Sequence, residues 1–302
     1  MFYKQKNQFQ RWWFDRAIRG MYDTPAMAPS SDPGAPLVLS QLQHRDVLMY
    51  LAAIKSFARQ VPVGGVHVLD DGSLTPQDHA TLARHVPGVT LHRIVDFREP
   101  DLPAGGTWER LAAIARLSES RYVIQLDADT LSLDALPEVC AAVRDDASFS
   151  IGTWDGQQIE EVLERAVTAR KHLQGVQPHV QVLAEAHFDH FESASTLRYV
   201  RGCSGFSGFA PGPGKLDLMR TLSARMQALI GARWMEWGSE QVMSNLVVAN
   251  QPNAIVLPHP DYADCEKMQS GRTRFVHFIG TCRFRRGVYA GRVRQTLLNG
   301  RT

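Results

Sequence analysis

Short apolar segments alternate with segments of helical periodicity between residues 37 and 143, and this alternation limits the possible folds more than any other feature of the chain. The helical segments carry apolar residues every three or four positions, whereas the strand candidates are short and mostly apolar. The strand candidates are Leu37–Ser40, Val66–Leu69, Leu91–Val95 and Tyr122–Leu126, and the helical segments are Asp46–Arg59, a segment that begins at Thr75-Pro76, Thr107–Leu117 and Leu136–Val143. Strands that alternate with helices form a parallel sheet covered by helices on both faces. We therefore predict an α/β fold with a mostly parallel central sheet.

The second half of the chain is less regular. We predict helices over Gln158–Leu173, Lys215–Ile230 and Ser239–Val248, and a strand over Phe275–Ile279. Thr107 and Ser239 have the side chains that commonly cap helix N-termini, so each is predicted to cap the helix that follows it.

Two strand candidates end in acidic loops. Asp70 and Asp71 follow one strand within DDGS, and Asp127-Ala128-Asp129 follows another. Ligands of parallel sheets bind beyond the carboxyl ends of the strands, so both loops are candidate binding segments. Carboxylates at the first loop can accept hydrogen bonds from ribose hydroxyls or a base N–H. The alternative is a turn in which Asp and Gly simply end the strand.

Asp127 and Asp129 are candidate metal ligands. Carboxylates at i and i+2 of an extended loop project to the same side, where they can converge on a hard cation such as Mg²⁺ or Mn²⁺. His277, in an apolar segment, offers an imidazole as a third ligand for Mn²⁺. The alternative interpretations are a solvated turn for the aspartates and a surface position for the histidine.

A glycine and several arginines follow His277. Gly280 would let backbone N–H groups approach a phosphate, and Arg283, Arg285 and Arg286 could neutralise a diphosphate through bidentate contacts. The alternative is a solvated basic surface. The segment from residue 267 to residue 302 has nine basic residues and no acid, although the formal net charge of the whole chain is only +2.

Glu240 and Gln241 begin a predicted helix, and Trp234 and Trp237 precede it. An acid and an amide at a helix start can hydrogen-bond sugar hydroxyls, and the indole rings are flat surfaces on which sugars stack. The alternative is that Glu240 helps to cap the helix while both tryptophans lie in the core.

Several classes of protein are excluded or disfavoured. The chain has no GxxxxGK[ST] phosphate loop, GxSxG elbow or HExxH motif, and no GxGxxG follows the first strand. No segment has the roughly 20 apolar residues of a membrane span, and no recognisable nucleic-acid-binding module is present. The four cysteines are scattered without a CxxC pair, which indicates neither a zinc knuckle nor a disulfide framework, so a cytoplasmic location is expected.

The first twenty residues mix five basic residues and one acid with aromatic rings. Lys4, Lys6, Trp12, Trp13 and Arg16 belong to this arm. One interpretation is a segment that lies on an anionic membrane surface, at the inner face of the membrane. The other is an arm that packs its tryptophans onto the domain. Residues 24–36 are rich in Pro, Ser and Gly and are predicted to be a linker.

Together these motifs resemble nucleotide-sugar-dependent glycosyltransferases of the GT-A fold, a Rossmann-like α/β architecture. The closest likeness is to the retaining family-8 group, which includes glycogenin-like and lipooligosaccharide galactosyltransferases. YVIQLDADTLSLDAL is similar to that group's strand and D-x-D motif, CSGFSGFA to its acceptor-side segment, and HFIGTCR to its H-x-x-G-x-x-K motif, with Arg283 in place of Lys. Glu240-Gln241 with Asn245 resembles its D-Q-x-x-x-N helix. VLDDGS instead resembles the inverting family-2 enzymes, so the stereochemistry stays open.

The resemblance implies a division of the chain into four parts. Residues 1–36 would be the arm and linker, 37–150 the nucleotide-binding half, 151–290 the acceptor-binding half and 291–302 a basic tail.

The resemblance also implies roles for individual residues. Asp127, Asp129 and His277 would hold Mn²⁺ or Mg²⁺ against the donor diphosphate. The donor would further contact a second set of residues, which comprises Ser40, Asp70, Asp71, Arg110, Gly205, Gly280 and Arg283. Glu240, Gln241 and Glu236 would be the catalytic residues, with Glu240 or Glu236 as general base if the enzyme inverts.

The function that these motifs imply is a metal-dependent hexosyltransferase. It would move a sugar from a nucleoside diphosphate sugar, with a UDP-sugar as the leading candidate donor, to a glycan or lipid-linked acceptor, and it would have no nucleic-acid partner. Two alternatives remain open. One is a nucleotidyltransferase that forms sugar nucleotides, although Leu37–Gln43 lacks the usual Gly-rich loop with a Lys. The other is a non-catalytic GT-A-like module that binds glycans or membranes.

Overall fold

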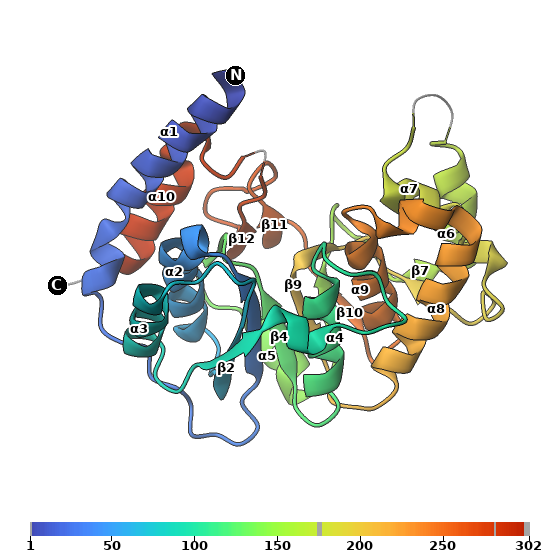
Figure 1. Cartoon of the computed structure of the whole chain (residues 1–302), viewed down its shortest axis with the longest axis horizontal. Helices are drawn as coiled ribbons and strands as arrows, with labels where there is room; N and C mark the ends of the chain where they lie inside the picture. Colours follow the sequence, from blue (N-terminus) through green and yellow to red (C-terminus); the bar gives the residue numbers. More distant parts are fainter. Residues whose placement is uncertain (1, 174–176, 281, 299–302) are drawn as a thin grey trace. The chain divides into compact units, whose positions relative to one another are not determined.

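The computed structural model describes residues 2–173, 177–280 and 282–298, with side chains from residue 8 onward (Figure 1). The chain forms two compact units. The first unit comprises residues 1–92, 126–140 and 260–302, and the second comprises residues 93–125 and 141–259. Each unit is built from segments that are distant in sequence.

The main sheet has seven strands in the hydrogen-bonded order β10-β6-β9-β4-β1-β2-β3. β1 pairs in parallel with β2, and β10 pairs in parallel with β6, whereas β6 and β9 are antiparallel. The predicted α/β fold with a mostly parallel central sheet flanked by helices is confirmed.

The first unit begins with a helical arm and a strand–helix alternation. Its elements up to residue 93 are α1 (Phe2–Ala17), η1 (Arg19–Asp23), β1 (Leu37–Leu42), η2 (His44–Asp46), α2 (Val47–Ala58), β2 (Gly65–Asp70), α3 (Pro76–His85) and β3 (Thr90–Arg93). Nearly all of α2 is buried, because its sequence VLMYLAAIKSFA is apolar on almost every face. The predicted start of α3 is confirmed: Pro76 is its first residue, and Thr75 and Asp78 form a reciprocal capping box.

The later elements of the first unit include a second, small sheet with the strand order β11-β12-β5. They are β5 (Thr130–Ser132), β11 (Tyr262–Asp264), β12 (Phe275–His277), η6 (Arg285–Gly287), α10 (Val288–Val293) and the π-helix η7 (Arg294–Leu298). Helix α10 lies beside α1 (Figure 1).

The second unit combines helices with strands of the main sheet. Its elements up to residue 151 are η3 (Ile94–Phe97), α4 (Trp108–Leu117), β4 (Val123–Leu126), α5 (Pro137–Arg144, whose first turn belongs to the first unit) and β6 (Phe149–Ile151). The later ones are β7 (Glu160–Glu161), α6 (Val162–Arg170), α7 (Val180–Glu185), η4 (Phe188–His190), β8 (Arg198–Tyr199), β9 (Cys203–Phe209), α8 (Lys215–Ile230), η5 (Gly231–Met235), α9 (Ser239–Ala249) and β10 (Ile255–Leu257).

The two predicted hydroxyl caps are wrong. Thr107 precedes α4 with a φ of +77°, and its hydroxyl donates to Glu240 instead of capping its own helix. Ser239 is already the first residue of α9, which Gly238 precedes with a φ of +103°, and the Ser239 hydroxyl accepts from the Trp108 indole. Both hydroxyls therefore form hydrogen bonds with residues distant in sequence and do not cap their own helices.

A disulfide joins Cys265 to Cys282 in the first unit, whereas the scattered cysteines gave no indication of one. Disulfides are rare in reducing compartments. The bond therefore removes one of the reasons for expecting a cytoplasmic location.

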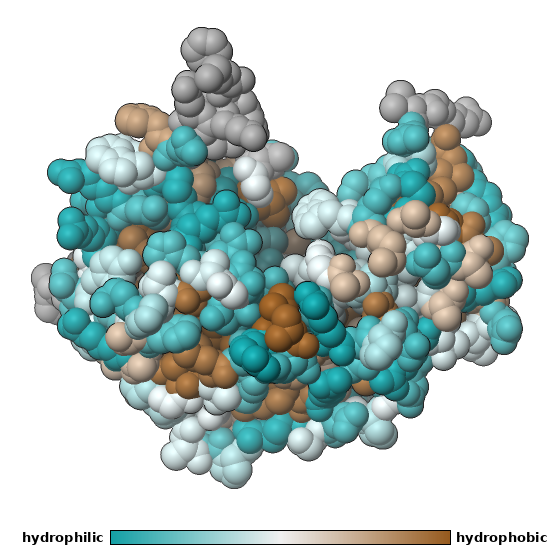
Figure 2. Space-filling view, in the orientation of Figure 1, coloured by the Kyte–Doolittle hydropathy of each residue, from teal (hydrophilic) through white to brown (hydrophobic). Residues whose placement is uncertain are grey.

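Figure 2 shows hydrophilic residues over most of the visible face of each unit, with hydrophobic residues in smaller groups between them. Within the described residues, no helix combines the length and the apolar character that crossing a bilayer requires.

A buried cation fixes the segment that follows η1. The Lys55 ammonium donates to the Thr24 hydroxyl at 2.6 Å and to the Pro25 carbonyl at 2.6 Å, and it lies 2.8 Å from Nδ1 of His85. Nδ1 can accept this bond only while the imidazole is neutral. Burial lowers the pKa of His85 below its ordinary value of 6.5, and the charge of Lys55 lowers it further.

This contact predicts a loss of stability in mild acid. The unfolded chain takes up a proton at His85 near pH 6.5 while the folded chain does not, so the free energy of unfolding should fall as the pH drops below that value. The slope from this group is at most about 1.4 kcal/mol per pH unit. Urea titrations at several pH values between 5 and 8 would measure this slope.

His85→Gln should reduce the pH dependence of the free energy of unfolding, whereas His172→Gln, at an exposed control position, should not. Identical slopes for wild type and His85→Gln would contradict this account.

Gly208 in β9 permits a close approach to β6. A Cβ atom at this position would lie 2.3 Å from Cε1 of Phe149 and 2.6 Å from the hydroxyl oxygen of Tyr122. Gly208→Ala should therefore destabilise the protein by about 1–3 kcal/mol or more through overpacking. The matched control is Gly291→Ala in α10, where no described atom outside the helix's own backbone lies within 4 Å of the added Cβ. Thermal unfolding would compare the two, and equal effects would contradict the prediction.

Candidate functional site

Asp127 and Asp129 occupy a tight turn at the end of β4. Both the backbone N–H and the hydroxyl of Thr130 donate to the carbonyl of Asp127, at 3.3 and 2.8 Å. Ser40, on the buried strand β1, donates its hydroxyl to the carbonyl of Leu126 at 2.6 Å. These bonds fix the loop at the strand end, where the alternating pattern predicted a site.

His277 reaches this loop through the small sheet. β12 pairs antiparallel with β5 so that His277 lies opposite Thr130, and the Phe278 N–H donates to the Asp129 carbonyl at 2.7 Å. Nε2 of His277 lies 3.3 Å from a carboxylate oxygen of Asp129 and 3.8 Å from one of Asp127. The structure thus brings the three predicted metal ligands together.

The cluster fits a divalent cation by the chemistry of its atoms. One ligand atom from each of Asp127, Asp129 and His277 lies within 4.8 Å of the others. Asp129 and His277 are buried, whereas the side chain of Asp127 is 26% exposed and forms the open side of the group. Two carboxylate oxygens and an imidazole nitrogen are ligands that Mn²⁺ accepts.

Arg283 contributes a fixed positive charge to the same cluster. Its guanidinium forms an ion pair with the second carboxylate oxygen of Asp129 and donates through Nε to the Phe278 carbonyl at 3.1 Å. Burial alone would raise the pKa of Asp129, but His277 and Arg283 overcome that effect and lower it to about 2. Asp129 is therefore ionised at neutral pH.

Tyr289 contacts the backbone of the loop that carries Asp127 and Asp129. No sequence pattern predicted a role for this residue. Its buried hydroxyl lies 3.4 Å from the Ala128 carbonyl and 3.3 Å from the Thr130 carbonyl. Its ring stacks on Phe278 with centroids 3.9 Å apart, and Phe14 of α1 packs against it at 4.7 Å. The only signal in the sequence was an aromatic residue in a basic tail, which describes Phe284 equally well.

The residues predicted to contact the nucleoside have local partners. Asp70 accepts from the backbone N–H groups of Gly72 and Leu74, and Asp71 accepts from Ser73. Gly72 has a φ of +95°, so this segment forms the turn given above as the alternative interpretation. Ser40 is buried and bonded to the strand that ends at the aspartates. Contact with a nucleoside therefore stays a prediction for these residues.

Gly280 is exposed, and among the described residues no atom beyond its chain neighbours lies within 4 Å of the position that a Cβ would take. It lies between His277 and Arg283 in the chain. Arg285 and Arg286 are also exposed. Contact of these residues with an anionic group stays a prediction.

Glu240 belongs to a buried polar cluster of the second unit. It accepts from the Thr107 hydroxyl at 2.8 Å and lies 3.4 Å from Nη2 of Arg110. Arg110 and Glu240 are both about 95% buried, so their charges depend on each other. The structure brings together two predicted site residues here and adds Thr107, which sequence reasoning treated only as a cap.

Gln241 follows on the same helix. Its side-chain oxygen lies 3.5 Å from the backbone nitrogen of Ser204, and its side-chain nitrogen donates to Gln181 at 3.4 Å. Gly205, beside Ser204, is buried within β9. Glu236 lies outside this group, because it is half exposed and forms an ion pair with Arg233.

The structure therefore assembles two groups of predicted site residues. Asp127, Asp129, His277 and Arg283 lie together in the first unit. In the second unit, Arg110 pairs with Glu240, and Gln241 lies beside the strand that carries Gly205.

Comparison with known proteins identifies the fold. No protein-family profile and no curated protein sequence matches the chain. Among solved structures, an active-site mutant of LgtC superposes with a TM-score of 0.51 at 12% identity, covering 86% of this chain and 94% of LgtC. The bifunctional glycosyltransferase WbbM superposes with a TM-score of 0.50 at 14% identity over 91% of this chain. The chain spans about half the length of WbbM, of which 51% is covered. At these identities the likeness shows shared architecture: the chain has the GT-A fold found in glycosyltransferases.

Proposed function

We propose that this protein is a metal-dependent glycosyltransferase that moves a hexose from a nucleoside diphosphate sugar to a glycan or lipid-linked acceptor. The observation that carries the proposal is the convergence of Asp127, Asp129 and His277 at the end of β4 on a GT-A fold. A fold alone does not define an activity, but a cluster of metal ligands at this strand end supplies the site that the activity needs. A UDP-sugar is the donor that we propose to test first.

Asp127, Asp129 and His277 would hold Mn²⁺ or Mg²⁺. When bound, such an ion neutralises charge on diphosphate oxygens and so favours departure of the nucleoside diphosphate. Arg283 keeps Asp129 ionised and oriented through their ion pair. Gly280 is exposed and has no side chain, so a phosphate could approach the backbone N–H groups of this segment.

Glu240 and Gln241 are the residues that we propose for the sugar and acceptor contacts. The Glu240 carboxylate is oriented by Thr107 and Arg110, which restricts its rotation. An inverting reaction needs a general base, and a retaining one can use the leaving phosphate to accept the acceptor proton. Of the two predicted bases, Glu240 is supported by its burial and fixed geometry, whereas Glu236 already pairs with Arg233 at the surface. Gln241 would donate or accept a hydrogen bond at a sugar hydroxyl.

Activity would be tested with UDP-, GDP- and dTDP-sugars and Mn²⁺, by following release of the nucleoside diphosphate with and without glycan acceptors. We expect turnover of at least one donor that EDTA abolishes and Mn²⁺ restores. Donor-dependent thermal stabilisation would identify the nucleotide before any acceptor is known. Full activity of Asp129→Asn, in protein that is folded by circular dichroism, would refute the metal-dependent mechanism.

Direct metal binding provides a second prediction that does not require turnover. Asp127→Asn removes a ligand charge at the exposed side of the cluster, so Mn²⁺ affinity measured by calorimetry in the presence of UDP should fall at least about tenfold. Asp134→Asn is the matched control, because Asp134 lies on the same segment, is exposed and is not among the three clustered ligands. Equal Mn²⁺ affinity in the two variants would remove Asp127 from the site.

A further inference from the structure

Helix α1 has an exposed aromatic stripe. Phe9, Trp12 and Trp13 are 66%, 57% and 47% exposed, and Arg16, also exposed, continues the series. These positions are spaced i, i+3, i+4 and i+7, so they lie on one face of the helix. Large aromatic side chains exposed together along one helix face are unusual in a folded domain and mark an interaction site.

The opposite face of α1 is already packed, so the stripe is not an incompletely buried core. Phe14 and Ile18 are buried, and Phe14 packs against Phe284 at 5.2 Å between ring centroids. Arg11 donates to Asp46 at 3.0 Å, which ties the helix to η2. The interpretation in which the arm packs its tryptophans onto the domain is correct in part: the Trp13 ring lies against Gly287, where a Cβ atom would be 2.9 Å from it, whereas Trp12 is 57% exposed.

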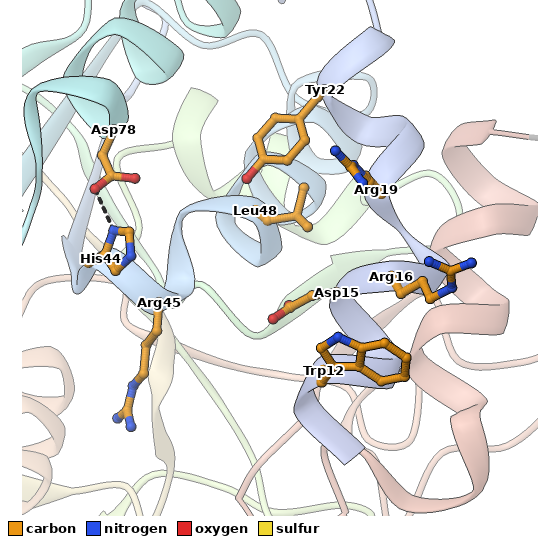
Figure 3. A pocket seen from close by; sticks show the side chains of 9 residues that line it. All are labelled: Trp12, Asp15, Arg16, Arg19, Tyr22, His44, Arg45, Leu48 and Asp78. Carbon is orange, nitrogen blue, oxygen red and sulfur yellow. Dashed lines mark hydrogen bonds and ion pairs between the residues drawn. The ribbon is translucent and has the colours of Figure 1, made fainter. Parts of the chain in front are cut away.

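A cavity of about 350 Å³ opens beside the stripe (Figure 3). It is formed by α1 and η1 on one side and by η2 with the starts of α2 and α3 on the other. Its lining residues are Trp12, Asp15, Arg16, Arg19, Tyr22, His44, Arg45, Leu48 and Asp78. A neighbouring cavity of about 460 Å³ shares three of these residues and extends along α3 to Arg84.

The charges that line the first cavity favour an anion. Among the described side chains, no acid forms an ion pair with Arg16, Arg19 or Arg45. Both acids of the cavity have other partners: Asp15 pairs with Arg11 at 3.2 Å, and Asp78 accepts from Thr75 and lies 2.6 Å from Nδ1 of His44. Guanidinium groups without acidic partners are suited to phosphate oxygens.

We propose that α1 binds an anionic lipid surface, with the aromatic stripe in the interfacial layer and a lipid headgroup phosphate at the cavity that Arg16, Arg19 and Arg45 line. A free phosphate would explain the arginines but not the aromatic stripe, and an apolar protein partner would explain the stripe but not the arginines. Aromatic rings beside arginines are the combination that interfacial helices present to anionic membranes.

Two aromatic side chains, Phe14 and Tyr289, connect helix α1 to the loop that carries Asp127 and Asp129. Phe14, on the buried face of α1, packs against Tyr289, whose hydroxyl bonds to the backbone of that loop. Membrane binding through α1 would therefore hold the metal-ligand cluster near the lipid surface. This inference goes beyond the proposed activity and does not depend on it.

Vesicle flotation of the full chain tests the proposal without donor or metal. We expect binding to vesicles of phosphatidylcholine with 30% phosphatidylglycerol, and much weaker binding to phosphatidylcholine alone. Arg16→Gln/Arg45→Gln should lower the partition coefficient about 10- to 30-fold, since each arginine near an anionic surface contributes about 1 kcal/mol. Sodium pyrophosphate at matched ionic strength should not displace the protein.

Matched controls separate this site from general electrostatics. Arg93→Gln/Arg144→Gln removes the same charge at exposed positions of other elements and should change binding less than twofold. Phe9→Ser/Trp12→Ser should weaken binding at least about tenfold, whereas Trp154→Ser, at an exposed residue of the second unit, should not. Circular dichroism would confirm that each variant is folded.

Four outcomes would overturn the proposal. They are equal losses in the two arginine pairs, unchanged binding of Phe9→Ser/Trp12→Ser, binding to neutral vesicles as strong as to anionic ones, and displacement by pyrophosphate, which would assign the cavity to a soluble phosphate ligand. None of these outcomes affects the glycosyltransferase assay.

Discussion

The antiparallel pairing of β12 with β5 is the interaction on which the candidate metal site depends. It places His277 opposite Thr130 and brings Arg283 to Asp129, although these last two residues are 154 positions apart. Burial by itself would favour the neutral form of the Asp129 carboxyl, because a charge is costly away from water. The imidazole and the guanidinium reverse that preference, so the sheet register maintains both the position and the ionisation of the ligand.

One face of helix α1 packs against the first unit, and the other face is exposed. Its Phe14 face extends the aromatic packing that supports the metal-ligand loop through Tyr289, and its other face carries the exposed tryptophans and Arg16. The three- and four-residue spacing produces two distinct stripes on one helix. A segment that looks like an appendage in sequence is therefore part of the first unit, and two of its basic residues, Arg16 and Arg19, line a cavity (Figure 3).

Sequence patterns predicted the elements better than they predicted the use of individual polar side chains. Helix α8 matches its predicted bounds, and α2 differs from them by one residue at each end, because apolar periodicity is a local property. Thr107 and Ser239 have the residue types of helix caps, but their hydroxyls contact Glu240 and Trp108, which lie more than 130 positions away. Cys265 and Cys282 likewise carry no local signature of their disulfide, because the two strands that bring them together are not recognisable as neighbours from the sequence.

The sequence by itself determined the alternation of strands and helices, the placement of Asp127 and Asp129 at a strand end, and the residue types that could serve as ligands. These features follow from periodicity and from local backbone geometry, which the chain encodes within about fifteen residues. Only the tertiary structure decided that His277 and Arg283 contact those aspartates and that the Tyr289 hydroxyl bonds to the backbone of their loop. It also decided that Glu240, and not Glu236, pairs with Arg110. Such contacts depend on strand register and helix packing between distant segments, and the same residue types in the same order could be arranged around different partners.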